Sequence, residues 1–460
     1  MTLLSYFTNS YINRGDNMRD TILKSVSVLF VLGFFAAAIW SSAVSGANPA
    51  PATRKSVMRL NNYADLFLRG NYDILHMIRV RELGKIGQAA KIAAGKKLAG
   101  GRVISHIGTP HIMYAGACAE DVPGNPNIAP DYRSNDPRFK IPEDLGKGDF
   151  LIVAGPGNQE YRKKGCFFLG FGFPMPTNRY SPPNYNDNPD TPMETQADLM
   201  IYDWAPKEDG LITPTLTSNL KVCPTSPVTV VEYWTFMAQL THNLAMKDTS
   251  GGFSKSAAYL DSLMGRLDVF HERNLYEVNI AGQRIAEKIL SGGKLFPWSI
   301  RNEFYIEATG TAGGLMGIYP LKSDSLTTKD VVILAFGGAT PEKEMEMARK
   351  IREKGAFLIG IYPFKREDGI STATLKKLCD MSFDNLSGDM DGVLGIPGYS
   401  RKIIPTTGMM NNTIFWAIIG AYIQAMESRG IAPYYWMSLH VPGGKAYDDS
   451  IRPYFEKRGY

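Results

Sequence analysis

A small-residue loop in the C-terminal half has the composition of an anion-binding site. Gly337, Gly338 and Thr340 lie between the apolar run 331–334 and a helical pattern over 345–354. Glycines let the backbone approach a ligand closely, and the start of the following helix offers unpaired N–H groups and the positive end of its dipole. The alternative is a turn that only joins a strand to a helix, because a lone Gly-Gly loop is a weak signal.

Other polar side chains could take part in the same chemistry. His111 follows a loop at the end of a predicted strand, where an imidazole could act as a general acid or serve only as a hydrogen-bonded structural residue. Thr340 could contact a phosphate or cap the following helix, and the two roles are compatible. Thr406 and Thr407 begin a helical pattern, which favours capping over ligand binding.

Short apolar runs predict the strands that end at these loops. The runs 331–334 and 356–361 flank the helical pattern, which is the order of a parallel βαβ unit. Three runs in the N-terminal half have the same character: 103–107, 150–154 and 167–171. The sequence therefore predicts an α/β protein with parallel sheets.

The two halves of the chain repeat each other. Asp203 aligns with Asp384, and segment 148–160 aligns with 329–342. Four blocks in the same order, at a spacing of roughly 180 to 190 residues, indicate duplication of a whole domain rather than a solenoid of short units. The two shorter blocks are Gly100-Gly101 with Gly292-Gly293, and Pro224-Thr225-Ser226 with Pro405-Thr406-Thr407.

Composition argues against several classes of function. The 460 residues are enough for two or three domains with a sizeable core. The net charge of +5 is spread along the chain without a basic block, so nucleic-acid binding is not expected. The four cysteines form no CxxC pair and no His/Cys cluster with zinc spacing, so no metal site is expected. The sequence does not decide whether the four cysteines form two disulfides or remain four buried thiols.

Residues 1–47 have the pattern of a secretory signal. Arg19 and Lys24 precede an apolar stretch over 25–43, and small residues follow it. Cleavage after Ala47 would release the protein, whereas an uncleaved signal-anchor would hold it to a membrane. Both readings place the bulk of the protein outside the cytoplasm, in the periplasm or the extracellular medium. Residues 48–62 are predicted to be a linker.

Several motifs resemble those of one family, the SIS (sugar isomerase) domains. The second copy resembles most the uncharacterised bacterial SIS proteins related to phosphoheptose isomerase, and the first copy resembles the family more loosely. The motifs are Ile306-Glu307-Ala308 leading to Gly313-Gly314, Asp384-Asn385 with Gly388-Asp389, Pro405-Thr406-Thr407, the stretch from Ser438 to Gly444, and Gly108-Thr109-Pro110-His111 in the first copy.

The resemblance implies a duplicated fold. Each copy would be a flavodoxin-like three-layer α/β/α sandwich with a five-stranded parallel sheet. The first would occupy residues 63–252, with Pro/Asn-rich insertions, and the second residues 253–460. Ligands of such sheets bind beyond the carboxyl ends of the strands.

The resemblance also implies a function. The ligand would be a small carbohydrate derivative such as a sugar phosphate, bound without a cofactor, and the reaction would be aldose–ketose isomerisation in a homo-oligomer. Glu307 matches the family's carboxylate base, with a surface helix glutamate as the alternative. The implied substrate-binding residues are Gly108, Thr109, Ser299, Arg301, Asn302, Gly337, Gly338, Thr340, Thr406 and Thr407, with Glu307 and His111 as the catalytic pair.

The chain departs from the family at the phosphate loop. The usual Ser-x-Ser-Gly-x-Thr reads Ala-Phe-Gly-Gly-Ala-Thr over 335–340, so only Thr340 keeps its hydroxyl. Arg301 could hold an anion with its planar fork in place of the lost hydroxyls, or be a surface arginine. Two functions therefore stay open: an exported sugar isomerase, or a non-catalytic carbohydrate-binding or structural protein.

Overall fold

The computed structural model describes most of the chain from Asn62 onward. The described residues belong to one compact unit that ends at Tyr460. They are 62–106, 142–154, 159–172, 197–206, 210–217, 220–300, 302–336, 341–365, 372–388, 392–437 and 443–460. The predicted signal segment 1–47 and almost all of the linker lie outside these residues. Among the helices that are described, none has the length and hydropathy that a membrane span requires.

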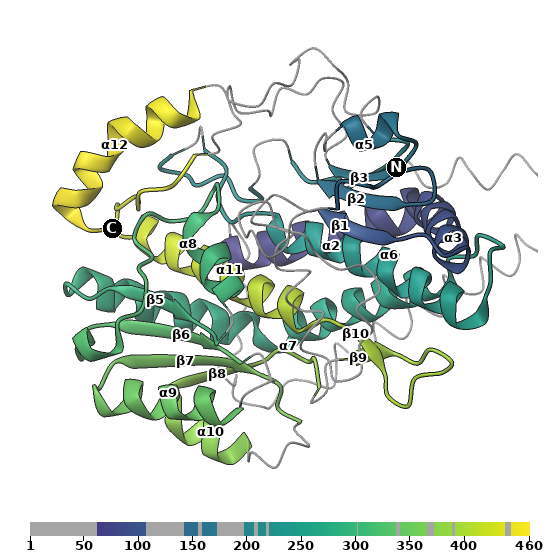
Figure 1. Cartoon of the computed structure of the whole chain (residues 1–460). Helices are drawn as coiled ribbons and strands as arrows, with labels where there is room; N and C mark the ends of the chain where they lie inside the picture. The colour runs from purple at the N-terminus through teal and green to yellow at the C-terminus, as the bar shows by residue number, and fades with distance from the viewer. Residues whose placement is uncertain are drawn as a thin grey trace, which may run out of the picture. The chain divides into compact units, whose positions relative to one another are not determined.

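Four parallel strands form the first sheet, in the order β1-β2-β3-β4 (Figure 1). They are β1 (Val103–His106), β2 (Phe150–Ala154), β3 (Phe167–Gly172) and β4 (Leu199–Tyr202). The helices of this half are α2 (Tyr63–Arg81), α3 (Leu83–Leu98), α5 (Gln159–Lys163) and α6 (Ser226–Met246).

The second sheet has the same parallel order, β5-β6-β7-β8. Its strands are β5 (Leu295–Trp298), β6 (Val331–Ala335), β7 (Phe357–Tyr362) and β8 (Met381–Asp384). Its helices are α7 (Ser254–Leu290), α8 (Asn302–Gly310), α9 (Pro341–Glu353), α10 (Thr372–Leu378), α11 (Thr407–Glu427) and α12 (Gly444–Arg458), with a 3-10 turn at Ser323–Ser325.

Alternate side chains of the central strands enter different apolar clusters. Ile152 of β2 and Ile333 of β6 belong to one large cluster that also contains residues of α2, α3, α6, α7 and α11. Leu151 and Val332 point to the opposite faces, into two separate clusters. Since strands buried on both faces read as continuous apolar runs, the sequence pattern has a direct physical cause. The predicted α/β class with parallel, flavodoxin-like sheets is confirmed.

The predicted fifth strand of each sheet is wrong for the described residues, which give each sheet four strands. After β8 the chain forms an antiparallel pair, β9 (Gly392–Leu394) with β10 (Ile403–Pro405). The first half has a matching antiparallel bridge between Ile212 and Val222. A Cβ on Gly392 would lie 1.9 Å from the Lys402 carbonyl oxygen, so the glycine lets the two strands approach closely. The proline at the end of β10 cannot donate to a sheet ladder, which limits the pair to a short one.

The helix α7 connects the two halves. It has 37 residues and packs on α2, α6 and α11. A Cβ on Gly282 would lie 2.4 Å from the carbonyl carbon of Ala421, so the backbones of α7 and α11 approach each other closely. The division into two domains between residues 252 and 253 remains a prediction. The largest apolar cluster of the described residues contains side chains from both sides of this boundary.

Candidate functional site

The carboxyl ends of β5 to β8 bring polar residues to one edge of the second sheet. We call this region the second-sheet edge and define it by Arg266, Ser299, Asn385, Thr406 and Asn411. Ser299 follows β5, Asn385 follows β8, and the remaining three come from α7 and the start of α11. Parallel α/β sheets bind their ligands at this edge.

A guanidinium lies at the start of α11. Arg266 of α7 donates to the hydroxyl oxygen of Thr406 at 3.0 Å and also to the carbonyl oxygen of Leu386. Thr406 occupies the N-cap position of α11, yet its side chain makes no capping hydrogen bond. A guanidinium group and the first N–H groups of a helix are both groups that attract an anion.

A buried amide pair fixes the end of β8 against α11. The Asn385 Nδ2 group donates to Asn411 Oδ1 at 2.9 Å, and Asn411 Nδ2 donates to the carbonyl oxygen of Phe336 at 3.2 Å. Asn385 is fully buried and Asn411 is 2% exposed. The pair therefore links the ends of β6 and β8 to the same helix and holds the edge in one arrangement.

Asp384 organises the backbone that presents these groups. Its Oδ1 atom accepts from the backbone N–H of Leu386 at 3.0 Å and from that of Phe364 at 3.1 Å. Leu386 has a φ of 57°, in the left-handed region that a branched side chain rarely adopts. This strained conformation accompanies the contact between the Leu386 carbonyl oxygen and Arg266.

Glu307, the predicted base, is 2% exposed on α8. That burial excludes the alternative of a surface glutamate. The helix α8 packs on α11 through an edge-to-face contact of Phe304 with Phe415, whose ring centroids are 5.4 Å apart. The catalytic role of Glu307 stays a prediction.

Of the other predicted site residues, the structure describes the side chains of three. Ser299 is half-buried, Thr406 is buried, and Thr407 is the first residue of α11. The following lie outside the described residues: Gly108, Thr109, His111, Arg301, Gly337, Gly338, Thr340 and the side chain of Asn302. Sequence reasoning missed Arg266 and Asn411, since both belong to long helical patterns without a motif.

The equivalent edge of the first sheet carries different chemistry. We define this first-sheet edge by Glu82, Tyr202, Asp203, Trp204 and Glu232. The Glu82 carboxylate accepts from Trp204 Nε1 at 3.1 Å and from the backbone N–H of Tyr202 at 3.3 Å, and it pairs with a lysine of α3 at 2.9 Å. Asp203, the counterpart of Asp384, accepts from a backbone N–H two residues later. Besides the aspartate that both halves share, the first-sheet edge holds two more carboxyl groups, Glu82 and Glu232, where the second-sheet edge has an arginine and two amides. Among the described residues, the second-sheet edge therefore suits an anion better than the first.

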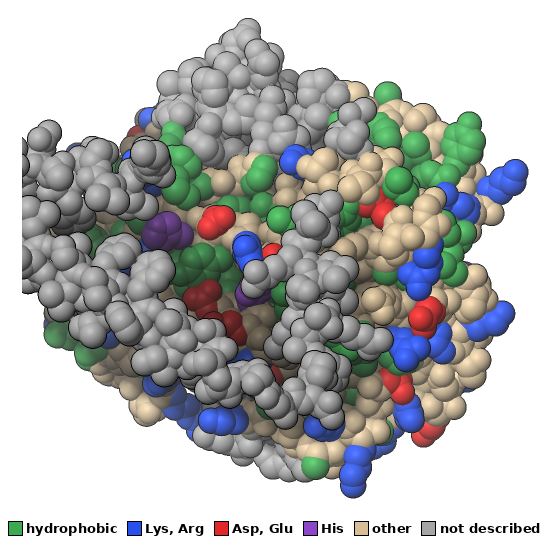
Figure 2. Space-filling model, turned by 180° about the vertical axis from the view of Figure 1, so that it is seen from behind, with side chains coloured by type: hydrophobic (Ala, Val, Ile, Leu, Met, Phe, Trp, Pro, Cys, Tyr) green, Lys and Arg blue, Asp and Glu red, His purple; other side chains and the backbone are tan. Residues whose placement is uncertain are grey.

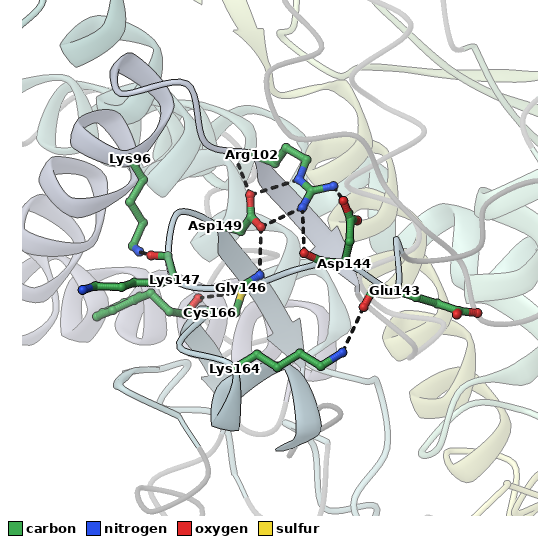
Figure 3. A network of polar contacts seen from close by, with 10 residues as sticks. Lys96, Arg102, Glu143, Asp144, Gly146, Lys147, Asp149, Lys164 and Cys166 are labelled. Atoms are coloured by element: carbon green, nitrogen blue, oxygen red, sulfur yellow. Dashed lines mark hydrogen bonds and ion pairs between the residues drawn. The ribbon is translucent and has the colours of Figure 1, made fainter.

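The amino ends of the strands form a second polar region, drawn in Figure 3. Arg102 donates to both carboxylate oxygens of Asp149, at 3.0 and 2.8 Å, and to Asp144 at 2.8 Å. These hydrogen bonds lower the pKa of Asp149 to about 2. The Gly146 N–H also donates to Asp149 at 2.9 Å, so the network joins the segment before β2 to the start of β1. Its role is structural.

The described surface offers few other candidates. On the face shown in Figure 2, basic side chains are scattered in small groups rather than gathered in one stripe, in keeping with the charge pattern of the sequence. Within the described ranges, no three His, Cys, Asp or Glu side chains are arranged to hold a metal ion.

Comparisons with known proteins give weak similarity over long stretches. No family model matches the sequence. A UPF0309 protein from Streptomyces griseus subsp. griseus is 21% identical over 237 residues, covering 44% of this chain and 94% of that relative. A UPF0309 protein from Brucella anthropi is 31% identical over 116 residues, covering 25% of this chain and 48% of that relative. The chain thus spans about half the length of the Brucella relative.

Among solved structures, the chain is similar to a proposed phosphosugar isomerase from Clostridium difficile 630. The identity is 11%, the TM-score is 0.46, and the alignment covers 85% of this chain and 98% of that chain. The C-terminal domain of glucosamine-fructose-6-phosphate aminotransferase from Francisella tularensis is 12% identical with a TM-score of 0.42, over 77% of this chain and 96% of that chain.

Proposed function

We propose that the protein binds a carbohydrate derivative that carries an anionic group, such as a sugar phosphate, at the second-sheet edge. The observation that supports this most is the guanidinium of Arg266 within 3.0 Å of the Thr406 hydroxyl at the start of α11. A planar guanidinium fork matches the oxygens of a phosphate or carboxylate, and the first N–H groups of a helix add to the attraction.

The rest of the edge would contact the sugar. Ser299 follows β5 and has a hydroxyl that can both donate to and accept from a sugar hydroxyl. The loop over 337–340 would add backbone N–H groups to the anion, as proposed from its composition. Asn385 and Asn411 already bind each other, so their part is to hold the edge rather than to bind the ligand.

If the protein is an enzyme, the reaction that we propose is isomerisation of the bound sugar. Glu307 would move a proton between adjacent carbons of an aldose or ketose. The alternative is a protein that binds the sugar without chemistry. The loss of two serines from the phosphate loop, at positions now occupied by Ala335 and Gly337, favours this alternative. Export through the segment 1–47 and assembly into a homo-oligomer are parts of the proposal that depend on the sequence alone.

A thermal-shift experiment tests the binding site. The full chain would be melted with a panel of sugar phosphates and with the same sugars lacking phosphate. A ligand at 100 times its Kd stabilises the folded state by about 2.7 kcal/mol. Arg266→Met should abolish the shift, and Arg273→Met, on the exposed face of the same helix, should leave it intact. An equal shift in wild type and Arg266→Met would refute the site.

Exchange of a substrate proton with the solvent distinguishes an isomerase from a protein that only binds the sugar. With a ligand from that panel in D₂O, isomerisation through Glu307 should place deuterium on the carbon next to the carbonyl group, seen by NMR. Glu307→Gln should bind the ligand and exchange nothing. Binding without exchange in wild type would establish the non-catalytic alternative.

A further inference from the structure

Glu232, in the second turn of α6, is a fully buried carboxyl group. Neither of its oxygens has a hydrogen-bond partner in the part of the chain that the structure describes. Burying an ionised carboxylate without a partner is far more costly than burying the neutral acid. The surroundings of Glu232 therefore decide its protonation state.

The charged groups that act on Glu232 are both carboxyls. They are Asp203, after β4, and Glu82, at the start of α3. Lys85 belongs to α3 as well, but it pairs with Glu82 at 2.9 Å and lies over the Tyr202 ring at 4.5 Å. The geometry gives Glu232 two negative neighbours and no cation of its own.

The other elements that pack on α6 place no buried charged side chain against it, and Lys255 of α7 acts on His242, about three turns further along α6. They are α2, α3, α7, α11, β3 and β10. None of the buried residues of these four helices is Asp, Glu, Lys, Arg or His. The strands β3 and β10 contain only apolar residues and glycine. Burial, and then the charges of Asp203 and Glu82, raise the pKa of Glu232 well above its ordinary value.

We propose that Glu232 is a proton switch in the first half: its carboxyl group is protonated when α6 is closed on α3 and the end of β4, and its ionisation at rising pH opens this corner. The second half provides an internal comparison. The residue equivalent to Glu232 is Thr413, whose hydroxyl lies 3.5 Å from the sulfur of Met409 in the same helix. The second half therefore has no ionisable group at this position.

The direction in which pH changes the stability of the closed state follows from where the proton is bound. The closed state holds a proton that the open, hydrated state releases near the ordinary pKa of glutamate. Stability of the closed state is thus fully present below that pKa and falls as pH rises toward the higher pKa of the closed state. Over this window the equilibrium constant for opening rises up to about tenfold per pH unit.

Hydrogen exchange measured by mass spectrometry at several pH values tests the switch on the full chain. After correction for intrinsic exchange, protection of α3 and α6 should fall by up to about tenfold per pH unit, while protection of α11 stays constant. Glu232→Gln, a neutral isostere, should remove the dependence on pH from α3 and α6. The proposal would be overturned if protection of α11 fell with pH as much as that of α3 and α6. It would also be overturned if protection of α3 and α6 depended on pH in Glu232→Gln as it does in wild type.

A second variant keeps the test independent of the folding of Glu232→Gln. Asp203→Asn leaves Glu232 in place and removes one negative neighbour. The loss of protection should then level off at a lower pH than in wild type, because the closed-state pKa is lower. An unchanged profile in Asp203→Asn would contradict the coupling on which the switch depends.

Discussion

Asp149 and Asp330 make the same pair of backbone hydrogen bonds in the two halves. Asp149 accepts from the N–H groups of Arg102 and Gly146, both at 2.9 Å. Asp330 accepts from those of Lys294 at 2.8 Å and Thr327 at 2.7 Å. Each carboxylate joins the starts of two neighbouring strands. The halves therefore agree at the amino ends of their strands, although they differ in chemistry at the carboxyl ends.

Replacing either aspartate by asparagine should destabilise the fold. Hydrogen bonds to a charged group contribute about 1.5–3 kcal/mol, and an amide can accept only on one of its two heavy atoms. We expect Asp149→Asn and Asp330→Asn each to lower the free energy of unfolding by about that amount, as measured in urea. Asp144→Asn is the matched control at an exposed partner of Arg102 and should change little. A similar loss in the control would contradict the role of the backbone hydrogen bonds.

Asp149 should also contribute to the acid limit of stability. Arg102 lowers its pKa to about 2, below its value in the unfolded chain. A lowered pKa gives stability that is present above the unfolded pKa and lost as pH falls through the folded one. The wild type should therefore lose this contribution between about pH 4 and pH 2. Urea unfolding of Asp149→Asn should show a flatter profile over this range; a profile as steep as that of wild type would count against the pairing.

Two glycines at equivalent turns should not tolerate a side chain. A Cβ on Gly101 would lie 2.0 Å from the Gly148 carbonyl oxygen, and one on Gly293 would lie 2.0 Å from that of Lys329. Overpacking against backbone typically costs about 1–3 kcal/mol, so Gly101→Ala and Gly293→Ala should lower the melting temperature. Gly84→Ala in α3 is the control, because nothing lies within 4 Å of its Cβ position, and it should stabilise the helix by about 0.5–1 kcal/mol.

Glu427 at the end of α11 should hold the first helix and a distant loop in place. Its carboxylate accepts from the Tyr63 hydroxyl at 2.5 Å, from the Thr215 N–H at 3.1 Å and from the Leu216 N–H at 2.8 Å. The Thr215 hydroxyl also donates to this carboxylate, at 2.8 Å. Glu427→Ala leaves all four donors without this acceptor and should cost about 2–3 kcal/mol. Tyr63→Phe removes a hydroxyl that donates to Glu427 and accepts from the Thr215 N–H at 2.9 Å, but that N–H keeps Glu427 as an acceptor. We expect this variant to cost less, about 0.5–1.5 kcal/mol. If Glu427→Ala and Tyr63→Phe lowered the free energy of unfolding in urea by the same amount, the carboxylate would not be shared among these donors.

The sheets could be predicted from the sequence, whereas the contacts at their edges could not. Apolar runs bounded by glycines identified the strands, because strands covered on both faces need such runs. The fifth strand was expected from the family resemblance; in the described residues each sheet has four strands, and the segment after β8 forms the separate pair β9 and β10. Arg266 and Thr406 are 140 residues apart, and no local pattern connects them. Glu232 stands inside an apolar helix, where only its lack of partners in the structure distinguishes it.

The helix α7, which both halves share, determines how the protein unfolds. It is about 55 Å long at 1.5 Å per residue, and side chains along it belong to the largest apolar cluster. Damage to one half removes support from the other, so the two should melt in a single calorimetric peak. A proteolytic cut within α7 would release two fragments that each expose apolar surface, and we expect both to aggregate.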